Sequence, residues 1–271
     1  MGQMRVEGGA PEENLARAVE MIRDATCQHC EIIVLPECLD VGWTDPSARD
    51  LAEPIPGTRT ELLSQAARDH GIHVAAGLTE RATDNLFNAA VLFGPSGEIL
   101  LHHRKINTLD IARDLYAVGD RLGVVVTPLG TIGLNICADN FPDSLAIGHV
   151  LARMGAQIIV APSAWAVESD HDTERTPCRT SWVTSFRELA RLYGIAIVGV
   201  SNVGWITGGP WKGRKCIGYS LAVGPDGAIL AEGKCDVDAE ELVVVDVPLR
   251  RPAAVGTDIA PMLRAKGYEG P

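Results

Sequence analysis

Several features that would assign this 271-residue chain to other classes of protein are scarce or missing. Basic side chains are few, 24 against 35 acidic ones, and the formal charge of −11 disfavours binding to nucleic acid and to anionic membranes. No apolar run approaches the roughly 20 residues that span a bilayer, and the amino terminus lacks the basic and apolar regions of a signal peptide. The sequence therefore predicts a cytoplasmic protein whose partners include neither nucleic acid nor a membrane.

The chain also lacks the marks of a divided or disulfide-linked protein. Its seven cysteines are an odd number, scattered and without a secretion signal, which fits reduced thiols better than a disulfide framework. No Pro/Gly/Ser-rich linker or charge run separates one part from another, and the length allows one large core. We expect a single domain over residues 1–271.

What is present predicts helices that alternate with buried strands. Helical spacing of apolar side chains predicts a helix over 11–25, and a capping-box pattern at 58–61 starts another. Further helices are expected over 142–154 and 182–193, strands over 32–36, 72–78, 130–136, 157–161 and 195–200, and hairpins over 89–101 and 219–231. Such an order indicates layered α/β packing with a mixed sheet.

Three predicted strands end in side chains suited to nucleophilic catalysis. Cys137 ends one strand and is followed at once by polar residues, so the chain turns sharply as an exposed nucleophile requires. Glu37 follows a second strand and Lys105 follows a third. Taken singly, a buried cysteine is usually an inert small hydrophobe, and the other two are commonly solvated charges. Together, a thiol, a carboxylate and an ammonium at separate strand ends indicate a catalytic site assembled by the fold.

The order of these residues resembles the nitrilase superfamily of carbon–nitrogen hydrolases, in its amidase-like branch. The family pattern of Leu-Pro-Glu, Arg-Lys and Gly-x-x-Ile-Cys-x-Asp occurs here at residues 35–37, 104–105 and 133–139. Further matching positions are Asn88, Arg187 and Asn202. The resemblance implies an α/β fold built as a four-layer α-β-β-α sandwich with mixed sheets, and a homodimer or higher homo-oligomer.

The resemblance implies hydrolysis of a non-peptide carbon–nitrogen bond through a cysteine thioester. An amide carbonyl is a poor electrophile, so the reaction needs a strong nucleophile, a base and a positive donor for the developing oxyanion. Cys137 attacks, Glu37 takes its proton, and Lys105 with the backbone N–H of Ala138 holds the oxyanion. Neither a metal nor an organic cofactor is required.

The chain departs from the family pattern in two places. Family members begin with a strand that ends in a glutamine, and only residues 1–4, with Gln3, remain of it here, so we expect a shortened first strand. A further family glutamate, placed after the lysine, is missing from residues 106–117. Asp110 is the candidate supporting acid, with Asp114 as the alternative, although a solvated aspartate is an equally good interpretation.

The substrate is indicated less sharply. The residues after Cys137 lack the Trp-Glu pair of true nitrilases and the arginines of some carbamoyl-amino-acid hydrolases, which favours a small-molecule amide over an N-carbamoyl amine or a nitrile. Candidate substrate-binding residues are Asn140 and, in the polar segment 165–179, Trp165 and Glu168. Two more tryptophans, Trp205 and Trp211, line either the pocket or a subunit interface.

Two remote alternatives belong to other classes. Cys27 and Cys30 have the Cys-x-x-Cys spacing of redox and zinc sites, but the sequence has no second such pair and the motif precedes a strand. A protein with this fold could also serve as a non-catalytic binding subunit. Retention of Glu37, Lys105 and Cys137 argues for an enzyme.

Overall fold

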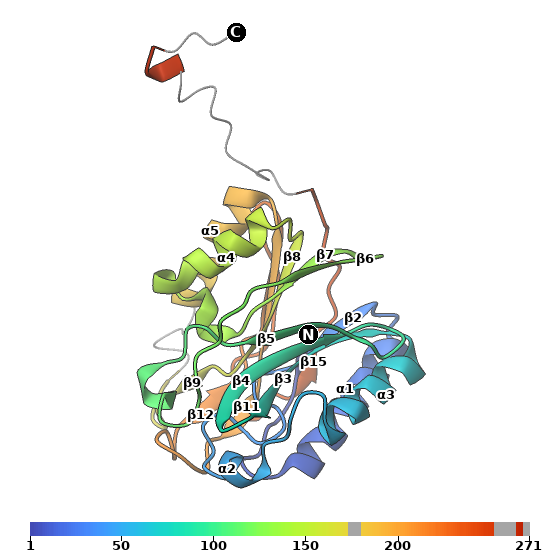
Figure 1. The fold of residues 1–271 in the computed structure, drawn as a ribbon, viewed down its shortest axis with the longest axis vertical. Helices are drawn as coiled ribbons and strands as arrows, with labels where there is room; N and C mark the ends of the chain where they lie inside the picture. Colours follow the sequence, from blue (N-terminus) through green and yellow to red (C-terminus); the bar gives the residue numbers. More distant parts are fainter. Residues whose placement is uncertain (173–179, 252–263, 268–271) are drawn as a thin grey trace.

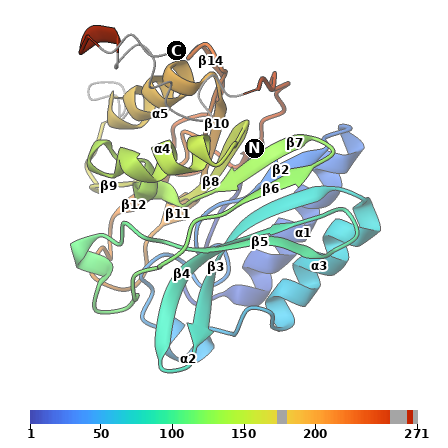
Figure 2. The ribbon, with the colours of Figure 1, turned by 45° about the horizontal axis from the view of Figure 1, so that its top comes forward.

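The computed structural model describes residues 1–172, 180–251 and 264–267. Two β-sheets face each other and helices cover the outer face of each, so four layers follow in the order α-β-β-α (Figure 1). The view in Figure 2 separates the two helical layers, with α4 and α5 on one side and α1 and α3 on the other. The four-layer sandwich with mixed sheets that the resemblance implied is confirmed.

The first sheet has four strands in the order β2-β3-β4-β5, with β2 and β3 parallel and the other neighbours antiparallel. Its strands are β2 (Ile32–Val34), β3 (His73–Ala82), β4 (Asn85–Phe93) and β5 (Ile99–Arg104). Helices α1 (Pro11–Cys27) and α3 (Thr58–His70) cover it, and the short α2 (Ala48–Leu51) lies in the loop between β2 and α3.

The second sheet has six strands in the order β14-β13-β10-β8-β7-β6, parallel at its centre and antiparallel towards both edges. Its strands are β6 (Val124–Thr127), β7 (Gly130–Leu134), β8 (Ile158–Ser163), β10 (Ala196–Ser201), β13 (Leu221–Val223) and β14 (Ile229–Glu232). Helices α4 (Leu145–Arg153) and α5 (Thr180–Tyr193) cover its outer face.

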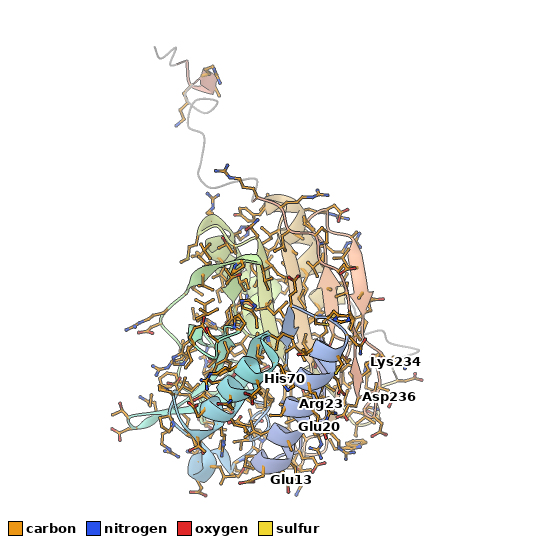
Figure 3. The ribbon with its side chains drawn as sticks, turned by 90° about the vertical axis from the view of Figure 1, so that its right-hand side faces the viewer. Glu13, Glu20, Arg23, His70, Lys234 and Asp236 are labelled. Carbon is orange, nitrogen blue, oxygen red and sulfur yellow. The ribbon has the colours of Figure 1, made fainter. Side chains whose placement is uncertain are left out.

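The pattern of burial on α1 shows why this segment forms a surface helix. Pro11, Leu15, Ala18, Ile22 and Ala25 are buried at three- and four-residue intervals, and the last four pack in the core against the first sheet. The charged side chains between them face outward, as Figure 3 shows for the labelled residues Glu13, Glu20 and Arg23. Glu12 and Glu13 lie in the first turn, where the helix dipole favours negative charge.

The predicted elements are confirmed with shifts at their ends. The capping box predicted at 58–61 is wrong in register, because the threonine that caps α3 is Thr60, whose hydroxyl accepts the N–H of Gly57 at 2.7 Å. The helix predicted over 142–154 divides into a 3₁₀ turn, Pro142–Ser144, followed by α4. Gly71 ends α3 in the left-handed conformation that glycine adopts without strain.

Two small sheets complete the fold. One has the order β11-β12-β9, formed by β9 (Ala166–Val167), β11 (Val203–Trp205) and β12 (Lys215–Ile217). The other pairs β1 (Gly2–Gln3) with β15 (Glu241–Leu242). Gln3 is buried, and its amide group bonds the backbone of Lys234, Ala239 and Ser220, which ties the short first strand to distant parts of the chain.

Candidate active site

Cys137 stands at a sharp turn after β7. Ile136 is still extended, whereas Cys137 has a φ of +40° and begins the 3₁₀ turn Cys137–Asn140. A non-glycine residue with a left-handed φ costs of the order of 1–2 kcal/mol and persists where its surroundings hold it in place. The turn directs the thiol away from the line of the strand, as the sequence predicted for a nucleophile.

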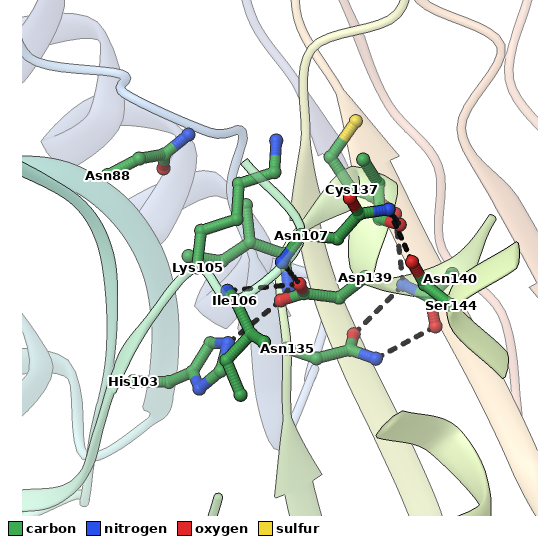
Figure 4. Close-up of polar contacts among 12 residues, drawn as sticks. Asn88, His103, Lys105, Ile106, Asn107, Asn135, Cys137, Asp139, Asn140 and Ser144 are labelled. Carbon is green, nitrogen blue, oxygen red and sulfur yellow. Dashed lines mark hydrogen bonds and ion pairs between the residues drawn. The ribbon is translucent and has the colours of Figure 1, made fainter. Parts of the chain in front are cut away.

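The carboxylate of Asp139 holds this turn against the end of β5. It accepts the N–H of Ile136 at 3.0 Å, the N–H of Asn107 at 2.7 Å and the N–H of Ile106 at 3.2 Å, and lies 2.8 Å from Nε2 of His103 (Figure 4). Asp139 is fully buried, so these contacts replace the water that an ionised carboxylate needs. The network joins the nucleophile turn to the loop that follows Lys105.

Glu37 and Lys105 form a buried ion pair next to the thiol. Lys105 Nζ donates to Glu37 Oε1 at 2.6 Å, and the side chain of Asn88 donates to the same oxygen at 2.5 Å. The side chains of Glu37 and Lys105 are only 1% and 2% exposed, so solvent screens their attraction very little. In Figure 4 the ammonium of Lys105 and the sulfur of Cys137 extend to the same side of the Asp139 network.

The electrostatics of the site favour a neutral thiol. Burial raises the pKa of Cys137 to about 12, the Glu37 carboxylate adds to this effect, and the Lys105 ammonium opposes it. Burial, the largest single cause, lowers the pKa of Lys105, but the charges and the hydrogen bond around its ammonium, led by the Glu37 carboxylate, together raise that pKa above its usual value. At neutral pH the site therefore holds an uncharged thiol and a fixed positive charge.

These groups open onto a small cavity of about 110 Å³. Its walls are Glu37, Lys105 and Cys137 together with Trp43, Leu109, Phe141, Ala164, Trp165, Ala166 and Trp211. The rings of Trp43 and Trp211 lie 4.8 Å apart between centroids, and those of Phe141 and Trp165 lie 6.1 Å apart. The structure thus brings the three predicted catalytic residues and Trp165 to one space, and places Trp211 in its wall.

Two other candidate residues lie in the nucleophile turn itself. The carbonyl of Ala138 accepts the side chain of Asn107 at 2.8 Å and the N–H of Phe141 at 3.0 Å, which fixes the orientation of that residue. The side-chain amides of Asn140 and Asn135 bond each other reciprocally at 2.8 and 2.9 Å. Asn140 also donates to the carbonyl of Cys137 at 3.4 Å, so its side chain contacts the backbone of the nucleophile turn.

The remaining charged candidates lie further out. Asp110 is 90% exposed and pairs with Arg113 at 3.2 Å. Glu168 is exposed and forms an ion pair with Arg214. Trp205 is half-exposed and lines a neighbouring groove rather than the wall of the cavity.

Sequence reasoning missed the network around Asp139 and the wall residues Trp43, Leu109 and Phe141. The motif itself contains the signal for Asp139, which follows Cys137 by two residues. Nothing in the sequence predicts the contact of Asp139 with His103. The wall residues come from three separate loops, and no local spacing connects them.

The structure also bears on the other large cavity and on the redox or zinc alternative. A larger cavity of about 600 Å³ lies elsewhere, lined by Met1, Cys30 and residues 243–249, and none of the predicted catalytic residues borders it. Cys27 and Cys30 are free thiols, and within the described ranges no three His, Cys, Asp or Glu side chains gather as a metal site would require. Among the helices of those ranges, none is both long and apolar enough to cross a membrane.

Comparison with known proteins identifies the family. The model of the Carbon-nitrogen hydrolase family matches residues 1–255. The chain is 30% identical over 262 residues to Omega-amidase NIT2 of Bos taurus, covering 91% of this chain and 87% of that protein. It is 35% identical over 168 residues to a nitrilase of Pyrococcus abyssi, covering 59% of this chain and 62% of the relative.

Solved structures share the fold. A carbon–nitrogen hydrolase from Helicobacter pylori G27 superposes with a TM-score of 0.77 at 24% identity, covering 87% of this chain and 84% of its own. A variant of the amidase from Nesterenkonia sp. AN1, with acrylamide added at its active-site cysteine, gives 0.78 at 20% identity and 98% coverage of both chains. With the family match over almost the whole sequence, this chain is an enzyme of the carbon–nitrogen hydrolase family.

Proposed function

We propose that this enzyme hydrolyses a small-molecule amide through a thioester on Cys137. The observation that carries the proposal is the convergence of Glu37, Lys105 and Cys137 on one small cavity from three separate strand ends. Amide hydrolysis agrees with the names of the relatives that match most of the chain, which are omega-amidases.

The first step follows from the protonation states. Because the Cys137 thiol carries its proton at neutral pH, attack on the carbonyl carbon needs a base at the sulfur. Glu37 is that base: Oε1 is engaged by Lys105, and Oε2 has no hydrogen-bond partner among the described residues. The proton moves from sulfur to Glu37 as the carbon–sulfur bond forms, and the carbonyl oxygen becomes an oxyanion.

The oxyanion is held by groups already in place. Lys105 stays protonated because Glu37 raises its pKa, and its ammonium donates to the oxyanion together with the N–H of Ala138. Glu37 then protonates the leaving nitrogen, the carbon–nitrogen bond breaks, and ammonia departs. Water attacks the thioester, giving its proton to Glu37, and releases the carboxylic acid and the thiol.

Ammonia release from a panel of compounds tests the proposal. The panel comprises short alkyl amides, ω-amides of dicarboxylic acids, N-carbamoyl amines and nitriles, with Cys137→Ala protein as the blank. We expect amides to give the highest kcat/KM. If nitriles or N-carbamoyl amines were preferred, the same three residues would instead catalyse one of the alternative reactions. If no compound were turned over, a non-catalytic binding subunit would be favoured.

The reactivity of the thiol towards iodoacetamide has an expected pH dependence. In the parent protein burial, the largest cause, and the Glu37 carboxylate together raise the pKa of this thiol to about 12. The thiolate fraction then grows about tenfold per pH unit between pH 7 and 9, because this range lies well below the pKa. The alkylation rate of the Cys137 peptide, followed by mass spectrometry, should rise with the same slope, and a plateau below pH 9 would contradict a thiol with a strongly raised pKa.

Three expectations from the sequence stay predictions. These are the cytoplasmic location, the single domain over residues 1–271 and the homo-oligomeric assembly.

The first strand is two residues long, and Met1 exchanges both backbone hydrogen bonds with Val243.

A further inference from the structure

Apart from the catalytic groups, the wall of the active-site cavity is apolar. Its other large side chains are Trp43, Leu109, Phe141, Trp165 and Trp211. Lys105 is the one cation among the described residues that border the cavity, and Glu37 pairs with it. A second charge on the substrate would therefore find no partner in this wall.

The size of the cavity limits the substrate further. An engineered apolar cavity of about 150 Å³ accommodates benzene. The cavity beside Cys137 has about 110 Å³, so it holds a smaller group. A chain of roughly four or five non-hydrogen atoms fits, which corresponds to a short alkyl group next to the carbonyl carbon.

An ion pair lies against the wall of the cavity, on the side where β9 and β12 continue outward, and we refer to this side as the mouth. Strands β9 and β12 are paired with Ala166 opposite Cys216, and Ala166 borders the cavity. Because side chains alternate along a strand, Glu168 and Arg214 continue on the same face as Ala166 and Cys216, one pair further out. They form an ion pair there, and the Arg214 guanidinium lies 4.2 Å from the ring centroid of Trp211, which is part of the cavity wall.

This pair neutralises a cation that lies against the cavity wall. An anionic tail entering the cavity would compete with Glu168 for Arg214 or lie unpaired against aromatic rings. Burying an ionised carboxylate without a partner is strongly unfavourable. An uncharged alkyl chain has no such cost and gains from contact with the wall.

We propose, on the basis of the function proposed above, that the acyl group of the substrate is short, uncharged and apolar. The side chains of Leu109 and Trp211 limit its length, and the Glu168–Arg214 pair excludes ω-amides that carry a second, ionised carboxyl group.

Butyramide and succinamate test this as a matched pair, because the two differ only in a terminal methyl or carboxylate. We expect kcat/KM for butyramide to exceed that for succinamate by at least about 100-fold. A smaller ratio overturns the inference while leaving the proposed function in place. Absence of ammonia from both compounds, and from the rest of the amide panel, above the Cys137→Ala blank removes the proposed function and this inference with it.

Leu109→Ala tests the wall. We expect this variant to prefer a longer acyl chain in the substrate. The kcat/KM for hexanamide relative to butyramide should rise by about tenfold, because the substitution opens space for two more methylenes. Leu115→Ala is the matched control, because Leu115 belongs to the same apolar cluster but not to the wall. An equal change in both variants would assign the effect to loosened packing and overturn the role of Leu109.

Glu168→Gln tests the mouth. With Arg214 released, succinamate should gain about tenfold in kcat/KM relative to butyramide. Asp170→Asn removes the same charge from an exposed position nearby and should leave the ratio unchanged. No gain in Glu168→Gln, or an equal gain in Asp170→Asn, overturns the role of the ion pair.

Discussion

Cys137→Ser should lower kcat by at least about 10⁴-fold while the protein stays folded. A serine hydroxyl is a much weaker nucleophile than a thiol, and Glu37 is the only base that the proposed mechanism offers it. The substitution exchanges one atom in a buried site, so the far-ultraviolet circular dichroism spectrum and the melting temperature should change little. Ammonia release from the best amide of the panel measures the loss.

The same substitution at a second buried thiol is the control. Cys216 is buried and has a pKa raised to about 12 by burial, as Cys137 has, but it does not border the cavity. Cys216→Ser should keep kcat within about tenfold of the parent protein. In addition, parent protein quenched with acid during turnover of that amide should carry an acyl adduct on the Cys137 peptide, trapped before water cleaves the thioester. An adduct confined to another cysteine, or equal losses in the two serine variants, would reject the assignment of the nucleophile.

The sequence was sufficient to locate residues at strand ends. Residues 130–136 and 32–36 are short apolar segments followed by a polar residue, and the period of a strand fixes where such a segment can end. The structure has β7 and β2 there, followed by Cys137 and Glu37. The ordered motif supplied what the local pattern lacked, namely that these ends meet at one place.

Residues in loops were harder to assign from sequence. Asp110 is predicted from its place soon after Lys105, and Glu168 from the polar composition of residues 165–179. The structure places both with exposed side chains that pair with arginines, because a loop has no period from which the direction of a side chain follows. Trp43 has no sequence signal of this kind, although its ring contacts that of Trp211, from a distant loop, in the cavity wall.

Lys105→Met should reduce both activity and stability strongly, because the lysine has two roles. It would hold the oxyanion, and loss of one such donor costs about 10²- to 10³-fold in kcat. It also compensates the Glu37 carboxylate, which is 1% exposed. Removing one partner of a buried ion pair costs about 3–5 kcal/mol in the free energy of unfolding, since the other charge remains buried. Denaturant unfolding and ammonia release measure the two losses separately.

A double variant separates these roles. In Glu37→Gln/Lys105→Met no charge is left unpaired, so most of the lost stability should return, whereas activity should not, because base and oxyanion donor are both gone. Lys234→Met is the control for loss of a lysine: its side chain is 80% exposed and lies 3.8 Å from Glu241, an arrangement worth about 0–1 kcal/mol. If Lys105→Met were no less stable than Lys234→Met, or if the double variant recovered activity, the buried pair would not hold the site together as the structure indicates.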